Sequence, residues 1–172
     1  MTLPPTPIAV AFTGPSNSGK TTLISKISLL LRDSYRVAIV KNDPKDKAQF
    51  DTPGKDSDIF FKTGAETVVV SPSRTTLFSH RSRELKEIVS MLGAFDILLV
   101  EGLKTLPLPR IAIFRKEIDP GYLPFCEAVA IDESVDIELY DVPERIAILD
   151  LNDPEAVIMW IAEHAKPIKE IE

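Results

Sequence analysis

Short apolar runs alternate with stretches of helical periodicity along the chain. Ile8–Thr13 is a continuous apolar run, too short for a typical helix, that leads into a glycine-containing loop; this suits a central parallel strand buried on both faces. Lys20–Leu31 then places apolar side chains at helical spacing, and Arg36–Val40 predicts a second buried strand. Together they form a strand-loop-helix-strand unit, whose crossover should be right-handed.

The rest of the chain continues this alternation. Further buried strands are predicted at Asp96–Val100, Arg110–Phe114, Glu127–Ile131 and Arg145–Leu149. A β-hairpin is predicted from Thr67–Val70 and Thr75–Ser79. Helices are predicted at Asp56–Lys62, at Arg81–Leu92 and after the N-cap Asp153, where Ala156, Val157, Trp160 and Ile161 form the core face. We find no linker and no repeat, so one α/β domain over residues 1–172 is expected.

Composition narrows the class of protein. The 172 residues are 44% hydrophobic and 27% charged, which is typical of a soluble globular protein. No apolar run reaches the roughly 18 residues that cross a bilayer, and Met1–Pro7 has no features of a secretory signal, so we expect a cytoplasmic protein without a membrane partner. The net charge of −6 argues against nucleic acid as a partner. The single cysteine, Cys126, is expected to be a buried structural thiol.

One motif carries specific chemistry. Gly14-Pro15-Ser16-Asn17-Ser18-Gly19-Lys20-Thr21 matches the pattern G-x-x-x-x-G-K-[ST] at every fixed position. It follows a predicted buried strand and opens a predicted amphipathic helix, which is the context that phosphate binding requires. The sequence therefore predicts a P-loop that binds a nucleoside triphosphate with magnesium, in an α/β fold of the P-loop NTPase type: a mostly parallel sheet flanked by helices, with a β-hairpin extension.

Each residue type in the loop has a physical reason. Gly14 and Gly19 let the backbone turn tightly and present its N–H groups to phosphate oxygens. Lys20 supplies a positive charge at the β- and γ-phosphates, and Thr21 offers its hydroxyl to magnesium. The predicted contact set is completed by Ser16, Asn17, Ser18 and Thr22.

Acidic residues are candidates to complete the metal site. Glu101 ends the apolar strand 96–100 and could hold magnesium through a water, or orient an attacking water. The long polar segment 41–54 leaves the second strand at its carboxyl end, where ligands gather in such sheets, so its aspartates, Asp46 among them, are further candidates. The alternative for each of these acidic residues is a solvated residue at a strand end or in a loop, without a role toward the metal. Asp96, at the opposite end of its strand, should lie far from the phosphates.

The chain resembles the molybdopterin-guanine dinucleotide biosynthesis protein B family from Ile8 to about His164. Beyond the P-loop, the motifs that carry the resemblance are Pro53-Gly54-Lys55-Asp56-Ser57, Lys62-x-Gly64-Ala65, Leu99-Val100-Glu101-Gly102-Leu103-Lys104, Ile111–Arg115 and Leu149-Asp150-Leu151-Asn152-Asp153. Family members usually carry a histidine-rich stretch beginning Lys-His after the second strand. Here that stretch is Lys41-Asn42-Asp43-Pro44-Lys45-Asp46, without histidine.

The resemblance implies a GTP-binding accessory protein with weak GTPase activity in the last step of molybdenum cofactor maturation. In that step a partner nucleotidyltransferase joins GMP to molybdopterin. The resemblance also implies a homodimer formed through the sheet region, and it allows Asp46 to be aligned with the family's acidic residue.

Base choice is open, because the N-K-x-D guanine signature is absent. Asp132, Asp150 and Asn152 are candidates to contact guanine, since a carboxylate suits the paired N1–H and N2–H donors and repels an adenine edge. The bland interpretation is that all three are turn or cap residues.

Two other functions fit the P-loop. In a small-molecule kinase, Arg74, Arg81, Arg83 and Lys86 could form a cationic lid over the transferring phosphoryl group. In a nucleotide-dependent adaptor, the protein would dock a partner enzyme and hydrolysis would be incidental.

Overall fold

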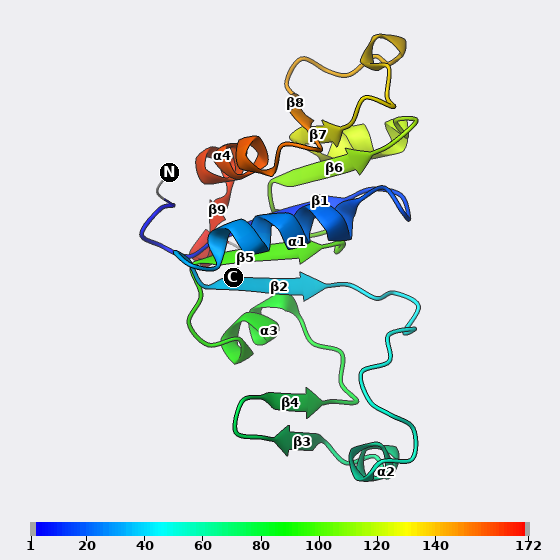
Figure 1. The fold of residues 1–172 in the computed structure, drawn as a ribbon, viewed down its shortest axis with the longest axis vertical. Coiled ribbons are helices and arrows are strands. Elements are labelled where there is room, and N and C mark those ends of the chain that lie inside the picture. Colours follow the sequence, from blue (N-terminus) through cyan, green and yellow to red (C-terminus); the bar gives the residue numbers. More distant parts are fainter. Residues whose placement is uncertain (1–2, 171–172) are drawn as a thin grey trace. The chain divides into compact units, whose positions relative to one another are not determined.

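The computed structural model describes residues 3–170. Its main sheet has the strand order β2-β5-β1-β6-β7-β8 (Figure 1). The six strands are β1 (Ile8–Thr13), β2 (Val37–Lys41), β5 (Ile97–Glu101), β6 (Arg110–Phe114), β7 (Ala128–Ile131) and β8 (Ala147–Asp150). All their pairings are parallel, and β9 (Lys166–Pro167) pairs antiparallel with the start of β1. The α/β fold with a mostly parallel sheet is confirmed.

The sheet forms because β1 is buried along its whole length. On one face, Val10 and Phe12 pack against α1 (Lys20–Leu31) and α4 (Pro154–His164) (Figure 1). On the other face of β6 and β7, Phe114 and Val129 pack with the 3₁₀ helix η1 (Pro120–Phe125). Because both faces of β1, β5, β6 and β7 are covered, these strands are buried along almost their whole length, whereas β2 and β8 are partly exposed.

The remaining elements of this part are short. The 3₁₀ helices η2 (Ile137–Leu139) and η3 (Ile168–Glu170) are present in addition to η1. Within residues 3–170, no helix is long and apolar enough to cross a membrane. Cys126 is buried as a free thiol, as expected, and burial raises its pKa to about 11.

Contacts divide the chain into two compact units, residues 1–42 with 92–172 and residues 43–91. The second unit holds α2 (Asp56–Lys62), a hairpin of β3 (Thr67–Val70) and β4 (Thr75–Phe78), and α3 (Leu85–Met91). The two strands pair antiparallel, which confirms the predicted hairpin. That all 172 residues behave as a single domain stays a prediction.

Sequence and structure differ at some boundaries. The third helix begins at Leu85 rather than Arg81, because the Glu87 carboxylate accepts a hydrogen bond from the Glu84 N–H at 2.9 Å and so fixes the start of the helix. In α4 the buried face includes Ile158, while Ala156 is only partly buried; Trp160 is in the core, as predicted. Asp153 caps α4 by accepting from the Ala156 N–H at 2.9 Å.

Three strands, β2, β5 and β8, end one residue later than the sequence predicts, β8 at Asp150. β2 extends to Lys41 and β5 extends to Glu101, and these two residues face each other in the register. Asp96 lies before β5 and binds Arg36, with both of its carboxylate oxygens engaged. It therefore lies at the amino ends of the strands, opposite the P-loop, as expected.

Candidate nucleotide-binding site

The loop between β1 and α1 has the backbone that a phosphate cradle needs. Gly14 has φ 137° and Gly19 has φ 102°, both in the left-handed region that favours glycine. A Cβ on Gly14 would lie 2.3 Å from the Ile113 carbonyl oxygen, so no other residue fits there. Asn17 supplies a third left-handed position at φ 64°, which asparagine tolerates. The fold thus bends six residues tightly at the carboxyl end of the central strand.

Lys20 lies over this loop. Its Nζ donates hydrogen bonds to the carbonyl oxygens of Gly14 at 3.0 Å and Pro15 at 2.5 Å. Partial burial lowers the pKa of Lys20, and the nearby Glu101 carboxylate opposes that shift. The ammonium group is therefore held over the loop by acceptors weaker than phosphate oxygens.

The start of α1 is open to an anion. Thr21 and Thr22 are exposed on its first turn, which contains no acidic side chain. Ser18 is buried, and its Oγ finds no hydrogen-bond partner among the residues that the structure describes. Unsatisfied helix N–H groups, the positive end of the helix dipole and an unpaired buried hydroxyl together fit a phosphate chain.

Glu101 lies at the same edge of the sheet, beside β1. Phe12 and Lys41 flank it in the strand register. Its carboxylate forms an ion pair with Lys41, with Nζ 2.9 Å from Oε2, and only 13% of the Glu101 side chain is exposed. Glu101 thus lies at the same edge of the sheet as the P-loop, and its role toward magnesium stays a prediction.

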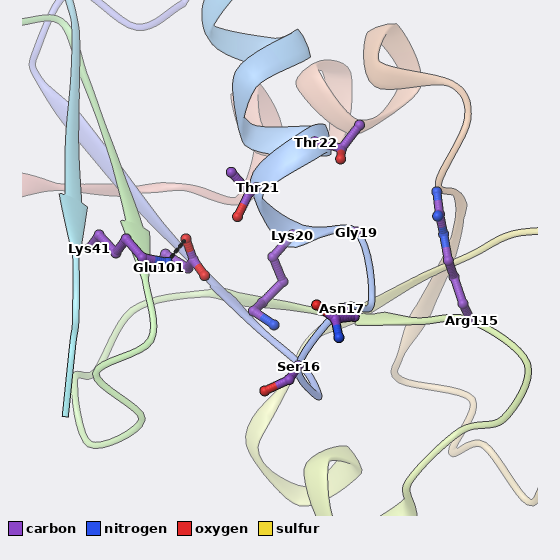
Figure 2. Close-up of a pocket in the computed structure, with 9 residues that line it drawn as sticks. All are labelled: Ser16, Asn17, Gly19, Lys20, Thr21, Thr22, Lys41, Glu101 and Arg115. Carbon is purple, nitrogen blue, oxygen red and sulfur yellow. Dashed lines mark hydrogen bonds and ion pairs between the residues drawn. The ribbon is translucent and has the colours of Figure 1, made fainter. Parts of the chain in front are cut away.

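A cavity of about 460 Å³ joins these groups. Figure 2 shows the loop and Lys20 in the middle, Lys41 with Glu101 on one side, and Arg115 on the other. The lining residues are Ser16, Asn17, Gly19, Lys20, Thr21, Thr22, Lys41, Glu101 and Arg115. Six of them belong to the predicted loop set and one is the predicted strand-end carboxylate.

The candidates for base recognition lie at this edge too, but outside the cavity lining. Asp132 follows β7 and pairs with Arg115, with Arg115 Nε 3.1 Å from its Oδ2. Asp150 ends β8 and accepts from the Asn152 N–H at 2.7 Å, as a turn residue does. β8 is three strands from β1 in the sheet order, a separation of roughly 14 Å at normal strand spacing. Contacts of Asp132, Asp150 and Asn152 with guanine stay predictions.

The remaining candidates belong to the unit 43–91. Asp46 is exposed there with φ 48°, and its role as a metal ligand stays a prediction. Three of the four cations considered for a kinase lid have partners in their own unit: Arg81 and Arg83 pair with Glu66, and Lys86 pairs with Glu84. Nothing in this unit favours the kinase alternative.

Sequence reasoning assigned no role to Lys41 or Arg115. Both come at the carboxyl end of a strand of the parallel sheet, β2 and β6 respectively, as Glu101 does on β5. The rule that singled out Glu101 would therefore have found them. Arg110 was also missed: it is 2% exposed, and its guanidinium donates to the carbonyl oxygens of Gly102, Leu103, Lys104 and Leu106. It holds the segment that follows Glu101.

A P-loop between the first strand and first helix, at the carboxyl edge of a parallel sheet, defines a protein of the P-loop NTPase-like class. Residues 9–132 match the family model described as molybdopterin guanine dinucleotide synthesis protein B. The chain belongs to this family.

A relative in sequence agrees with this assignment, and solved structures share the fold. The chain is 34% identical over 164 residues to the molybdopterin-guanine dinucleotide biosynthesis adapter protein of Escherichia coli K12. The aligned region covers 90% of this chain and 91% of the relative. The crystal structure of Bacillus subtilis MobB superposes with a TM-score of 0.74 at 23% identity, covering 91% of this chain and 98% of that one. A crystal structure of molybdopterin-guanine biosynthesis protein B gives a TM-score of 0.69 at 25% identity, with 90% and 98% covered.

Proposed function

We propose that this protein is a GTP-binding accessory protein of molybdenum cofactor biosynthesis. It assists a partner nucleotidyltransferase that attaches GMP to molybdopterin, and it hydrolyses GTP slowly when alone. The observation that carries the proposal is the P-loop of Gly14 to Thr21 with Glu101 beside it, in a chain of this family. The proposal keeps the cytoplasmic location expected from the sequence.

The site's charges suit a triphosphate. Lys20, Lys41 and Arg115 surround a cavity with one carboxylate, Glu101, so the lining has an excess of positive charge in a chain whose net charge is −6. Because the charges of the chain as a whole repel anions, this local excess directs a phosphate chain to the cavity. The loop amides and the α1 N-terminus then bind the oxygens.

The residues also fit magnesium carried by the nucleotide. Thr21 would supply a hydroxyl ligand and Glu101 a carboxylate, and magnesium would neutralise charge on the β- and γ-phosphates. Among residues 3–170, no group of three or more His, Cys, Asp or Glu side chains is placed to hold a metal ion. We therefore expect magnesium to bind together with the nucleotide and weakly without it.

Calorimetric titration with GTP, GDP and ATP, with and without magnesium, tests the proposal. Lys20→Ala should weaken GTP binding by about a hundredfold or more, since it removes a charge-assisted contact to phosphate. Lys26→Ala, a lysine on the exposed side of α1, is the matched control and should bind as the wild type does. Unchanged binding by Lys20→Ala would contradict the proposed site, and equal affinity for ATP and GTP would contradict the choice of guanine.

A second possible function is that of a nucleotide-dependent adaptor, which differs from the first only in that GTP hydrolysis is not required. The Escherichia coli relative is named an adapter protein, which favours a nucleotide-dependent docking role. Glu101→Gln separates the two possibilities, because it preserves the size of the side chain while removing its charge. If cofactor maturation survives while GTP hydrolysis is lost, nucleotide binding is the function; if both are lost while calorimetry still shows GTP binding, hydrolysis is required.

We also propose that the protein forms a homodimer through the β3–β4 hairpin. Of residues 43–91 only Thr67 is buried. Val68 and Val70 alternate on one face of the hairpin, where Val68 stands opposite Leu77, and all three side chains are exposed. Such an apolar face is normally covered in the functional assembly.

Light scattering coupled to size-exclusion chromatography tests the dimer. Val70→Lys should shift a dimer toward monomer, because it places a charge in the apolar face. Leu139→Lys is the control: Leu139 is 76% exposed, similar to the 73% of Val70, but lies in η2 of the other unit. A wild type that is monomeric at all concentrations, or a dimer insensitive to Val70→Lys, would contradict this interface.

A further inference from the structure

Arg115 lies against the phosphate loop from a different strand. It directly follows β6, which neighbours β1 in the sheet. A Cβ on Gly19 would lie 3.4 Å from Arg115 Nε and 3.5 Å from Nη2, so the guanidinium covers the glycine at the N-cap of α1. Its side chain is 43% exposed and lines the cavity (Figure 2). A guanidinium in this place can reach a ligand held by the loop.

Asp132 fixes the position of this arginine. Its Oδ2 pairs with Arg115 Nε, while its Oδ1 accepts from both the backbone N–H and the hydroxyl of Ser134. Only 12% of the Asp132 side chain is exposed. The hydrogen bonds from Ser134 and the charge of Arg115 lower the pKa of Asp132, so the group stays ionised. The ion pair with Asp132 is formed by Nε, and the Arg115 side chain is still 43% exposed and lines the cavity, so its guanidinium can meet a ligand there.

The position in the cavity indicates which part of a nucleotide Arg115 would meet. Thr21 and Glu101 mark the side of magnesium, hence of the β- and γ-phosphates. Arg115 lies on the other side of the loop from Glu101, as Figure 2 shows. A P-loop cradles the α- and β-phosphates with its amides, so the far side receives the α-phosphate and the nucleoside.

Asp132 itself is poorly placed to read guanine. Accepting both N1–H and N2–H of the base takes both oxygens of a carboxylate. Here Oδ1 already accepts two hydrogen bonds from Ser134, which occupy both of its lone pairs, and Oδ2 pairs with Arg115. If Asp132 instead holds Arg115 in place, none of these contacts has to change when the nucleotide binds.

We infer that Arg115 binds the α-phosphate and ribose end of the nucleotide, and that Asp132 is a positioning residue that acts through Arg115. The inference rests on the proposed function, because it assigns a further residue of the same site. It makes Arg115 a determinant of nucleotide affinity that does not depend on the γ-phosphate.

The first test compares GTP and GDP by calorimetry. Arg115→Ala should weaken both by the same factor, about ten- to a hundredfold, as expected for loss of a charge-assisted contact. Arg115→Lys should lie between Arg115→Ala and the wild type, because it keeps the charge but loses the planar fork. Arg32→Ala, an exposed arginine at the end of α1, is the charge-matched control and should bind normally. Thermal unfolding shows that each variant is folded.

Some results would overturn the inference alone. Suppose that the wild type binds GTP and that Arg115→Ala binds GTP and GDP with the same affinities as the wild type. Arg115 then does not contact the nucleotide. A loss confined to GTP would place it at the γ-phosphate instead. If the wild type binds no nucleotide, the proposed function fails first and the inference fails with it.

The second test concerns Asp132. If it acts through Arg115, Asp132→Asn weakens GTP and xanthosine triphosphate alike, and the double variant with Arg115→Ala binds no more weakly than Arg115→Ala does. Asp132→Glu should restore part of the affinity. If Asp132 reads guanine, Asp132→Asn gains preference for xanthosine triphosphate, whose C2 carbonyl replaces the amino donor, and the two losses add. That outcome would overturn the positioning role.

Discussion

The two units of the chain differ in how much of their apolar surface is buried. In the sheet unit, every residue of β1 is buried, and so is every residue of β6. In the unit 43–91, α2 and α3 contain no buried residue. The sheet unit thus has its own hydrophobic core, and it can hold the P-loop rigidly. The second unit has surface to offer to a partner.

This difference agrees with the proposed placement of the nucleotide site in the sheet unit and of the dimer interface in the hairpin. A phosphate site needs groups held to within fractions of an ångström, and the buried ends of parallel strands provide that. The exposed valines of β3 and β4 need no such precision, because apolar contact is not directional. Four changes to the protein or its conditions test this difference in burial, and their expected effects range from large to small.

Separating the second unit should have the largest effect. We expect residues 43–91 expressed alone to be unfolded by circular dichroism, because only Thr67 in that range is buried and a two-stranded hairpin is marginal in water. Residues 1–172 under the same conditions are the control. A cooperative thermal transition of the fragment would show that it is a domain in its own right, against the single domain expected from the sequence.

Truncating a core side chain comes next. Leu99→Ala should lower the free energy of unfolding by about 2–5 kcal/mol, since Leu99 is fully buried in β5 and the change leaves a cavity. Val70→Ala, measured on dilute monomer, should change it by less than about 0.5 kcal/mol because that side chain is 73% exposed. Urea denaturation measures both values, and similar costs at the two positions would refute the contrast drawn between the units.

Replacing Arg110 should have a smaller but clear effect. Arg110→Met removes the guanidinium donor from four carbonyl oxygens of the segment after Glu101, of which only that of Leu103 keeps a second donor, the Leu106 N–H; the cost is about 1–3 kcal/mol in unfolding free energy. Arg32→Met, at an exposed position, should be nearly neutral. Denaturant unfolding measures both free energies. An unchanged free energy of unfolding for Arg110→Met would mean that water replaces the guanidinium.

The smallest effect depends on pH. Hydrogen bonds from Arg36 lower the pKa of Asp96 to about 2, below the roughly 3.9 of an unfolded aspartate. A depressed carboxyl pKa stabilises the fold above the unfolded value, and this contribution disappears as the pH falls through about 4 to 2. The difference in unfolding free energy between wild type and Asp96→Asn should therefore shrink below pH 4. A difference that is constant from pH 7 to pH 2 would contradict the role of this ion pair.

Much of this fold could be predicted from the sequence because the signals are local. The run Ile8–Thr13, the motif Gly14 to Thr21 and the helix Lys20–Leu31 follow from spacing and residue type, and the structure has the same bounds. Glu101 was predicted by its place at the end of an apolar strand. The shorter third helix was missed because its start is set by a side-chain contact of Glu87 to the Glu84 N–H.

The sequence by itself determined the P-loop, the parallel α/β class and the strand-end carboxylate, because each depends on residues close together in the chain. Only the tertiary structure decided that Lys41 pairs with Glu101 across 60 residues and that Arg115 meets both Gly19 and Asp132. These contacts depend on the strand order β2-β5-β1-β6-β7, which brings the carboxyl ends of distant strands to one edge. No local pattern encodes that order, since it is set by how the whole sheet buries its two faces.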